Sequence, residues 1–424
     1  MVLRCVVVGG GPGGMVLAYL LGQAGVAVCL LESHRDFDRD FRGDSLHPYT
    51  LELLDELGLG DALLTLGHHP ARQFRFHTPA ASVTVADYAR LPTRRNYVAL
   101  MPQAQFLDFL AGRARQLPGC EIRTGAKVTG LLHDGAGTVR GVQYTDAADG
   151  GRHELTADLV VGADGRFSKI RQLAGIPARS LGASTDLLWF RLPRVPTDPP
   201  DADAELYFGR DHYVGVLGGV TDWQVGYTLP KGDYAAARDR GVEPIRAFIA
   251  RHVPWLADRV HMLTDFRQTT LLSVEISRVQ TWHRPGLLLI GDAAHVISPV
   301  GGNGILMAIQ DAVAAANVLV PALRPIDPPA NGANNVEAAL EHVQRMRAPA
   351  IEQVQRAQVR LEQRTARARA AGRSIAPPGR LLKIVTALPV VRTRNARANA
   401  YGPRPPKLST AVLRCAENGK NTYG

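Results

Sequence analysis

Cysteine pairs and long apolar runs are missing from this chain of 424 residues, and each absence excludes a class of protein. The four cysteines, Cys5, Cys29, Cys120 and Cys415, are scattered and form no CxxC motif, so neither a disulfide framework nor a zinc site is expected. No apolar run approaches the roughly 18 residues of a membrane span, and the N-terminus has no signal-peptide pattern. We therefore expect free or buried thiols, no metal, and a location in the cytoplasm.

Acidic residues become scarce toward the C-terminus, and the positive charge of the chain is concentrated there. The net charge is +10, yet from Leu340 onward there are 17 Lys and Arg against four Asp and Glu, so the rest of the chain is slightly acidic. No nucleic-acid recognition motif accompanies this basic tail, so we expect no nucleic-acid partner. The tail is interpreted either as a solvent-exposed helical face or as a weak contact with an anionic membrane surface.

Glycine is abundant near the N-terminus. The stretch VVVGGGPGG has five glycines in six positions between an expected strand and an expected helix, and Glu32 ends the next expected strand. Gly9 allows a tight turn, Gly11 lets the backbone approach a diphosphate, and Gly14 lets helix and strand pack closely. The helix N-terminus favours the diphosphate, and Glu32 favours an unmodified adenosine ribose, so FAD or NAD fits. The predicted dinucleotide contacts are Gly9, Gly11, Pro12, Gly13, Gly14, Glu32 and Ser33.

Two later stretches are similar to motifs of a known family. LTADLVVGADGRFSKIRQLAGI at 155–176 resembles a DG motif, and GLLLIGDAAHVISPVGGNGILMAIQDA at 286–312 resembles a GD motif. With the opening glycines, and in this order and spacing, they make residues 1–345 similar to the single-component FAD-dependent aromatic hydroxylases. This is the para-hydroxybenzoate hydroxylase-like family of flavoprotein monooxygenases, which includes ubiquinone-biosynthesis and polyketide-tailoring hydroxylases. The resemblance implies that the dinucleotide is FAD.

Residues of the GD stretch also suit a flavin on physical grounds. Asp292 ends an apolar strand at the carboxyl edge of the predicted sheet, where it can hold a ribityl hydroxyl or, alternatively, cap a helix. The glycines around Asn303 let the backbone approach a flat ring, and the helix that follows can stabilise negative charge on the reduced ring. The predicted cofactor contacts here are Gly291, Asp292, Pro299, Gly301, Gly302, Asn303 and Gly304.

The resemblance implies cofactor contacts in two further segments. Asp164 and Arg171 match the DG motif, which relatives use near the diphosphate; a plain turn with a salt bridge is the alternative. Arg42 and Gln103 match cofactor-contacting residues of the family, or else they are solvated surface residues.

The resemblance also implies which side chains face the reactive ring. Pro299 would lie beside the substrate. Apart from the resemblance, His47 and Asp44 share one loop and are candidates to face the ring, although loop residues of these types often only cap and turn. Pro299 and His47 are therefore the predicted catalytic residues. Asn303 and Leu306 depart from the Gln and Asn that relatives usually carry.

The predicted fold class is α/β, with a discontinuous Rossmann-like FAD-binding domain, an inserted, mostly antiparallel β-sheet substrate domain and a C-terminal helical region. Buried-strand patterns at 3–8 and 286–292 flank alternating, aromatic-rich strands, and an Ala-rich helix follows that Pro321 would end. The expected boundaries are 1–71, 101–180 and 279–335 for the FAD-binding domain, 72–100 and 181–278 for the substrate-binding domain, and 336–424 for the C-terminal helical region and basic tail.

The resemblance implies an FAD-dependent monooxygenase. A single GxGxxG leaves no second dinucleotide site, so NAD(P)H is expected as a transient electron donor. Relatives form a flavin C4a-hydroperoxide with O2 and hydroxylate or epoxidise a small molecule, here expected to be hydrophobic and aromatic or polyketide-like. Aromatic strand residues are the candidate substrate contacts, although such residues also form cores: Trp189, Tyr207, Tyr213 and Trp223.

Two other functions fit the same fold. One is a flavin-dependent reductase or oxidase, such as a prenyl reductase, and the other is a non-catalytic prenyl-protein escort. Incorporation of labelled O2 into the product separates the monooxygenase from the first, and FAD binding separates it from the second.

Overall fold

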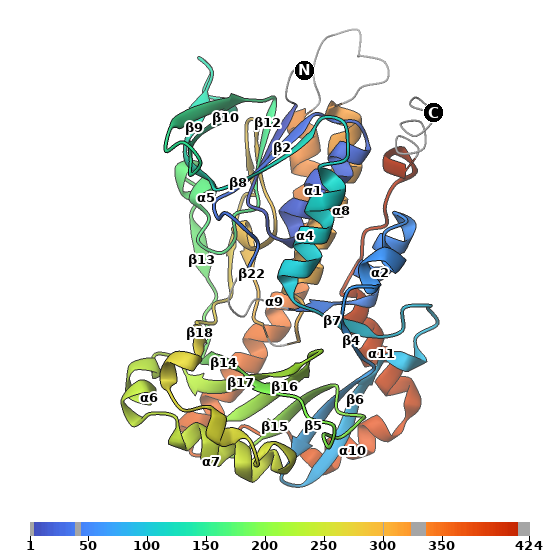
Figure 1. The fold of residues 1–424 in the computed structure, drawn as a ribbon, viewed down its shortest axis with the longest axis vertical. Helices are drawn as coiled ribbons and strands as arrows, with labels where there is room; N and C mark the ends of the chain where they lie inside the picture. The colour runs from blue at the N-terminus through green and yellow to red at the C-terminus, as the bar shows by residue number, and fades with distance from the viewer. Residues whose placement is uncertain (1–3, 39–43, 300, 324–335, 414–424) are drawn as a thin grey trace.

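The computed structural model describes residues 4–38, 44–299, 301–323 and 336–413, which form two lobes (Figure 1). A six-stranded sheet with its helices lies at the top of the view, and a seven-stranded sheet lies below it. Helix α9 (Val336–Ala370) runs along both lobes. The chain therefore has an α/β fold, as predicted.

The upper sheet consists of short apolar strands in the order β20-β21-β12-β1-β2-β8. Neighbouring strands are parallel except β20 and β21. Helices pack on one face and a small antiparallel sheet packs on the other, which explains why the central strand CVVV is apolar on both faces and buried. The strands are β1 (Cys5–Val8), β2 (Val28–Glu32), β8 (Cys120–Thr124), β12 (Leu159–Gly162), β20 (His283–Arg284) and β21 (Leu287–Leu289).

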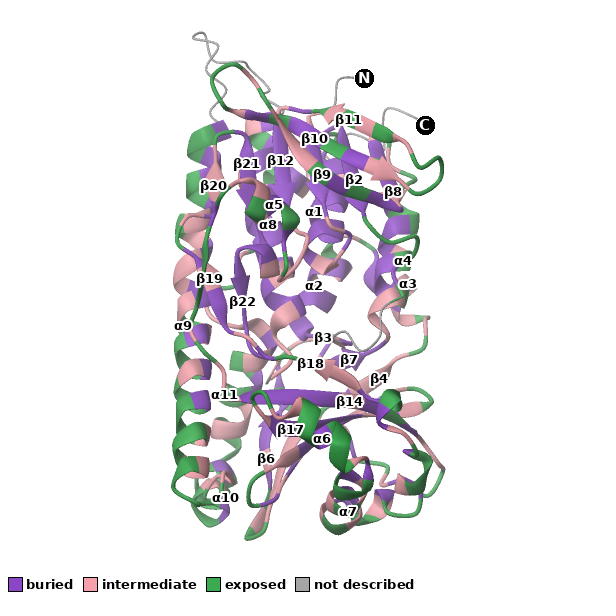
Figure 2. Cartoon of the chain, turned by 90° about the vertical axis from the view of Figure 1, so that its left-hand side faces the viewer, coloured by how far each residue is buried: buried purple, intermediate pink, exposed green. Residues whose placement is uncertain are grey.

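The helices of the upper lobe bring distant sequence segments together. Helix α1 packs against both α8 and α4, and its buried residues run almost without interruption, as Figure 2 shows. The three described cysteines are buried and free in this lobe. The helices are α1 (Pro12–Gln23), α2 (Pro48–Glu56), α3 (Gly60–Leu64), α4 (Gln103–Ala114), α5 (Lys169–Leu173) and α8 (Gly304–Leu323).

Three small sheets complete the upper lobe and its border. One is an antiparallel sheet of β9 (Ala126–His133), β10 (Val139–Asp146) and β11 (Arg152–Thr156). The other two sheets each join segments from different parts of the chain. They are β3 (Ser45–Leu46), β7 (Val98–Leu100) and β4 (His69–Ala71), and β13 (Ala178–Ser180), β19 (Ser277–Val279) and β22 (His295–Val296).

The lower sheet has the order β18-β14-β17-β16-β15-β5-β6, and all its neighbours are antiparallel except β15 and β5. Helix α7 covers one face, where side chains of β14 and β17 form a second hydrophobic core with it. The elements are β5 (Gln73–Thr78), β6 (Ala81–Asp87), β14 (Thr185–Pro193), β15 (Ala204–Phe208), β16 (Tyr213–Gly218), β17 (Asp222–Pro230), β18 (Thr270–Leu272), α6 (Tyr234–Arg240) and α7 (Glu243–His252).

The C-terminal region is helical and returns to the body of the molecule. After α9, helices α10 (Gly379–Ala387) and α11 (Pro389–Tyr401) pack against β6, and α11 also contacts α2 in the upper lobe. The end of the chain thus borders both lobes (Figure 1).

Helix α8 differs from its prediction in two respects. Pro321 does not end it, because the helix continues to Leu323 and a proline in the last turn removes only one hydrogen bond. By length and composition alone α8 is also apolar enough to cross a membrane, whereas the sequence analysis expected no segment of that kind. Most of its residues are buried against α1 and α9, as in the core helix of a globular lobe.

Candidate functional site

The glycine turn between β1 and α1 combines close packing with open space. Gly9 has φ +105°, and a Cβ on it would lie 2.5 Å from the carbonyl oxygen of Ala163, so a side chain cannot be accommodated. A Cβ on Gly11 would meet nothing within 4 Å. Gly11 is the N-cap of α1, which has no side-chain cap and no acidic residue in its first turn. This end of the helix therefore has room and unpaired N–H groups for an anionic ligand.

Glu32 is placed against this turn by β2. Its Oε2 accepts a hydrogen bond of 2.8 Å from the backbone N–H of Gly10. Its Oε1 accepts a bond of 3.1 Å from the Ser33 hydroxyl and lies 2.8 Å from Nδ1 of His34. Glu32 is only 8% exposed, whereas the imidazole is mostly exposed and can move aside for a ligand.

The three motif stretches converge. Besides the contact between Gly9 and Ala163, a Cβ on Gly13 would lie 3.0 Å from the carbonyl oxygen of Ala308 in α8, and one on Gly291 would lie 3.2 Å from the Ala308 side chain. The guanidinium of Arg171 donates a 2.9 Å hydrogen bond to the carbonyl oxygen of Ala293, next to Asp292. The opening glycines, the DG stretch and the GD stretch thus meet at one place.

Asp164 stabilises its own loop. Its carboxylate accepts hydrogen bonds of 2.5 Å from the Ser168 hydroxyl and 3.0 Å from the backbone N–H of Ile170. Burial raises the pKa of Asp164, and these hydrogen bonds oppose that shift. Arg171 donates to carbonyl oxygens, so the described contacts show a capped turn without the salt bridge of the alternative interpretation.

The loop before α8 is open on one side and held on the other. The N–H of Gly302 donates to the carbonyl oxygen of Pro299 at 2.9 Å, and a Cβ on Gly304 would meet nothing within 4 Å. One on Gly302 would lie 3.4 Å from Oγ of Ser45 and 3.8 Å from Cε1 of His47. The loop of His47 and the loop of Pro299 are therefore neighbours, as the prediction for the reactive face requires.

Asn399 of α11, which the sequence did not indicate, holds this loop. Its Nδ2 donates to the carbonyl oxygen of Gly301 at 3.0 Å and to Oδ1 of Asn303 at 3.2 Å, and its Oδ1 accepts from the Tyr88 hydroxyl. Burial lowers the pKa of His47 to about 4, although a hydrogen bond with Asn399 partly opposes this. His47 is therefore neutral at pH 7. The basic composition of the tail indicated an exposed surface, so the sequence did not predict this contact.

A buried charged cluster behind Gly291 was also missed. Asp311 of α8 accepts hydrogen bonds from the N–H of Gly291 at 3.0 Å and from Nε of Arg347 at 2.7 Å, and it lies 2.6 Å from Nε2 of His295. Asp311, His295 and Arg347 are at most 2% exposed. A lone carboxylate in the apolar segment AIQDAVAAA was the available signal, because buried charges need partners.

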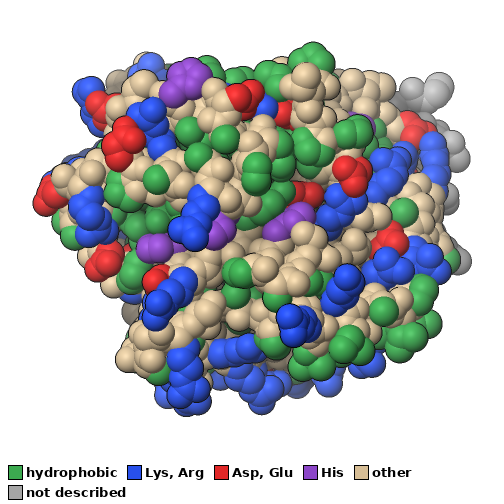
Figure 3. Space-filling model, turned by 90° about the horizontal axis from the view of Figure 1, so that it is seen from below, with side chains coloured by type: hydrophobic (Ala, Val, Ile, Leu, Met, Phe, Trp, Pro, Cys, Tyr) green, Lys and Arg blue, Asp and Glu red, His purple; other side chains and the backbone are tan. Residues whose placement is uncertain are grey.

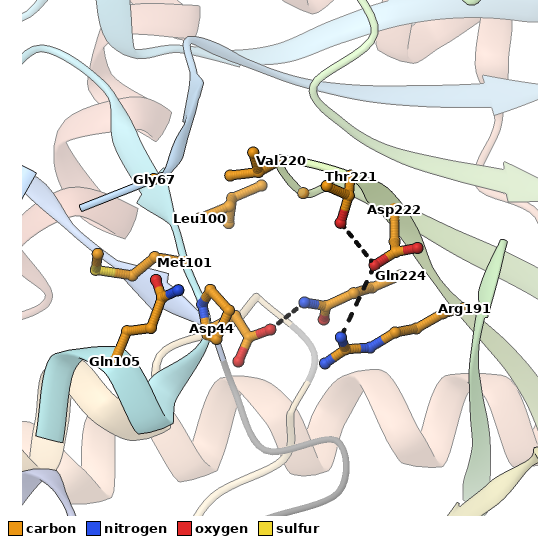
Figure 4. Close-up of a pocket in the computed structure, with 12 residues that line it drawn as sticks. Asp44, Gly67, Leu100, Met101, Gln105, Arg191, Val220, Thr221, Asp222 and Gln224 are labelled. Carbon is orange, nitrogen blue, oxygen red and sulfur yellow. Dashed lines mark hydrogen bonds and ion pairs between the residues drawn. The ribbon is translucent and has the colours of Figure 1, made fainter. Parts of the chain in front are cut away.

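A cavity of about 210 Å³ lies at the border between the lobes (Figure 4). Asp44 points into it from the upper lobe, while Arg191 of β14 and Gln224 of β17 reach it from the lower sheet, as cross-strand neighbours. The lining residues are Asp44, Gly67, Leu100, Met101, Pro102, Gln105, Arg191, Gly219, Val220, Thr221, Asp222 and Gln224.

Asp44 is a buried titratable group of this cavity. Burial raises its pKa from 3.8 to about 6, and hydrogen bonds from Gln103 and Gln224 and the charge of Arg191 only partly oppose the shift. The N–H of Gln103, the first residue of α4, donates to Oδ1 at 3.1 Å, and the Gln224 amide donates to Oδ2. The predicted cofactor residue Gln103 thus contacts Asp44 through its backbone.

The four aromatic candidates divide between the two faces of the lower sheet. Tyr207 and Trp223 lie in the core under α7, where the Trp223 indole donates to Asp198 at 2.7 Å. Trp189 pairs with Gly226, two residues from Gln224, so Trp189 and Tyr213 share the face of Arg191 and Gln224. None of the four lines the cavity, and their contact with a substrate stays a prediction.

Two further residues from the sequence analysis, Arg42 and Leu306, are not part of the site described above. Arg42 lies outside the described residues. Leu306 is fully buried in α8 and packs in the core of the upper lobe. Within the described ranges, no group of three or more His, Cys, Asp or Glu side chains is arranged to hold a metal ion.

Comparison with known proteins connects this geometry to a family. Residues 3–330 match the FAD binding domain family. The chain is 39% identical over 356 residues to 6-methylpretetramide 4-monooxygenase of Streptomyces rimosus, covering 83% of this chain and 82% of that protein. It is 30% identical over 322 residues to rifampicin monooxygenase of Streptomyces venezuelae, covering 72% of this chain and 62% of that protein.

A solved structure has the same fold. OxyS anhydrotetracycline hydroxylase from Streptomyces rimosus aligns with a TM-score of 0.69 at 23% identity, covering 96% of this chain and 78% of that one.

Proposed function

This chain belongs to the FAD binding domain family of flavin-dependent monooxygenases, and from that premise we propose that it inserts one oxygen atom of O2 into an aromatic or polyketide-like small molecule, with NAD(P)H as electron donor. The convergence of the three glycine-rich stretches around the open positions of Gly11 and Gly304 carries this proposal. The named activities of the tetracycline and rifampicin relatives support the substrate class.

The residues around the open positions fit FAD. The α1 N-terminus would receive the diphosphate, Glu32 the adenosine ribose, Asp292 the ribityl chain, and the loop from Pro299 to Gly304 the ring edge. FAD when bound supplies the transfer of electrons and the activation of O2, and the chain supplies orientation and exclusion of water. Arg171 would keep the DG and GD stretches in register, because it bonds the backbone beside Asp292.

The lower sheet is proposed as the substrate lobe. We keep the boundaries 72–100 and 181–278 for it, and 1–71, 101–180 and 279–335 for the FAD-binding lobe. The cavity between Asp44 and Gln224 supports this division, because it opens where the two lobes meet. Pro299 stays the residue predicted beside the substrate, and His47 stays a residue predicted to face the ring. The neutral state of His47 would let it act as a hydrogen-bonding group without adding charge.

Turnover with isotope-labelled oxygen tests the activity. The FAD-loaded protein is incubated with NAD(P)H, ¹⁸O2 and a panel of phenols, naphthols and polycyclic aromatics. We expect one compound to accelerate NAD(P)H oxidation many-fold and its product to gain one ¹⁸O atom. A product without label would indicate a reductase or oxidase, and a protein that cannot be loaded with FAD would indicate a non-catalytic role.

Gly11→Ala tests where the cofactor lies. The added methyl group meets nothing in the protein, so the fold is expected to keep its stability, while FAD affinity falls at least tenfold because the backbone can no longer approach the diphosphate. The matched control is Gly112→Ala in α4, which also faces open space, away from the motifs. Equal FAD affinity of Gly11→Ala and the wild type, measured by flavin fluorescence, would contradict this placement.

The exposed side chains of the C-terminal region favour a weak contact between this region and a membrane surface. Leu381, Ile384, Leu388 and Val390 are 58 to 75% exposed on α10 and at the start of α11, and Lys383 and other basic residues are interspersed with them. Figure 3, which views this end of the molecule, shows Lys and Arg side chains beside hydrophobic patches. We expect co-flotation with vesicles containing phosphatidylglycerol, lost in Ile384→Glu and absent with phosphatidylcholine alone. The location in the cytoplasm stays a prediction.

A further inference from the structure

The Asp44 carboxylate points into the cavity between the lobes, and the binding of the cofactor does not explain its position there. Asp44 lies one residue before Ser45, whose hydroxyl would lie 3.4 Å from a Cβ added to Gly302, so the cavity adjoins the proposed position of the ring. Gly67, Leu100 and Val220 supply apolar or small walls, and Gln224 and Arg191 supply polar groups at one end (Figure 4). An apolar pocket with a few convergent polar groups is the usual form of a small-molecule site.

We propose that the Asp44 carboxylate accepts a hydrogen bond from an aromatic hydroxyl group of the substrate, and so selects hydroxylated fused-ring aromatics and orients them against the ring. The inference rests on the proposed function and adds the chemical feature that the site recognises. Asp44 is thereby a specificity-determining residue of the oxygenation.

The carboxylate has acceptor capacity to spare. Each oxygen accepts one hydrogen bond from the described residues, the backbone N–H of Gln103 at Oδ1 and the Gln224 amide at Oδ2. An ionised carboxylate offers about four acceptor positions, so two stay available for a ligand. The two protein donors also fix its orientation, because they come from different lobes.

The charges around Asp44 favour a neutral donor over an anion. Arg191 of β14 attracts the carboxylate, but Asp222 of β17 lies 3.9 Å from Arg191 and offsets its charge. His47 in the same loop is neutral at pH 7. A neutral phenolic hydroxyl therefore gains a charge-assisted hydrogen bond, whereas a phenolate would meet a second negative charge.

Calorimetric titration of the FAD-loaded protein with 2-naphthol, whose hydroxyl stays neutral up to pH 8, tests the proposal. Asp44 changes from mostly protonated to ionised between pH 5 and pH 8, because its pKa is about 6. We expect 2-naphthol to bind about tenfold more tightly at pH 8 than at pH 5, since hydrogen bonds to charged groups are the stronger ones. The control ligand is 2-methoxynaphthalene, which has no hydroxyl hydrogen and should bind independently of pH.

The variant Asp44→Asn should bind 2-naphthol about tenfold more weakly than the wild type at pH 8 and show no pH dependence. Asp108→Asn, an exposed carboxylate of α4, is the matched control and should behave as the wild type. If Asp44→Asn is poorly folded, the wild-type contrast between the two ligands decides alone.

Three results would overturn the inference. They are equal 2-naphthol affinity of Asp44→Asn and the wild type at pH 8, the same pH dependence for 2-methoxynaphthalene, and no saturable binding of 2-naphthol. FAD content and NAD(P)H oxidation, measured on the same samples, separate the two proposals. A protein that retains FAD and responds to an aromatic, but without dependence on Asp44, contradicts only this inference; one that retains no FAD contradicts the proposed function as well.

Discussion

Two buried carboxylates flank the candidate site, and their surroundings differ. Asp311 lies behind Gly291 within contact distance of His295 and Arg347, and all three are almost fully enclosed. Asp44 lies at the edge of a cavity with two neutral hydrogen-bond donors, and the charge of Arg191 acts on it from the same cavity. Burial raises the pKa of both groups, but at Asp311 the interactions with His295 and Arg347 more than compensate and leave its pKa lowered.

The difference indicates different tasks. A carboxylate that is ionised and fully partnered holds the backbone N–H of Gly291 in place and costs much if a partner is removed. A carboxylate whose burial is only partly offset by hydrogen bonds and by a nearby cation is destabilising when ionised, and such groups concentrate at sites that bind or react. Asp311 therefore belongs to the framework of the upper lobe, and Asp44 to the ligand cavity.

Replacing Asp311 should have the largest effect. Asp311→Asn leaves the Arg347 guanidinium buried without its counter-charge, so we expect a loss of about 3 kcal/mol or more in the free energy of unfolding, together with weaker retention of FAD. Urea unfolding at pH 7.5 measures the first quantity. The exposed control Asp108→Asn should change it by less than about 0.5 kcal/mol. A similar small change in Asp311→Asn would remove the distinction between the two carboxylates.

Replacing Asp44 should change the free energy of unfolding in the opposite direction, toward greater stability. Its folded pKa of about 6 exceeds the ordinary value of 3.8, so the folded state binds the proton more tightly and loses stability as pH rises from about 4 to above 6. Asp44→Asn should therefore increase the free energy of unfolding by about 1 to 2 kcal/mol at pH 8 and leave it unchanged near pH 4.

The Gln224 amide can rotate to serve an Asn at position 44, so the variant need not lose its contacts. Unfolding curves of both proteins at the two pH values give the comparison. Destabilisation at pH 8 would mean that Asp44 acts as a framework group like Asp311.

Replacing Gln224 should have the smallest effect. Gln224→Met removes one hydrogen bond to the ionised form of Asp44, so the pKa of Asp44 should rise further, by roughly half a unit to one unit. The midpoint of the pH dependence of 2-naphthol affinity reports this shift. Gln105→Met, which lines the same cavity without a bond to Asp44, should leave the midpoint in place. An unchanged midpoint in Gln224→Met would show that the amide does not stabilise the carboxylate.

Local patterns in the sequence were sufficient for the α/β class and for the turn between β1 and α1. The apolar run before Gly9, the glycine spacing and the acidic end of β2 act over about thirty residues, so their geometry follows from short-range sterics. The same holds for the antiparallel β9–β11 sheet and for the helix after Gly304. The role of each residue toward FAD stays a prediction that the variants above address.

The sequence by itself determined a βαβ start, a family and a cofactor, because each motif that indicates them consists of residues close together in the chain. Only the tertiary structure decided the surroundings of Asp44, whose partner Gln224 is 180 residues away, and the contact of Asn399 with the Gly301 loop, 98 residues away. It also decided which face of the lower sheet carries Arg191 and Gln224. Burial and long-range hydrogen bonds set the pKa and orientation of these groups, and neither quantity is encoded in a local pattern.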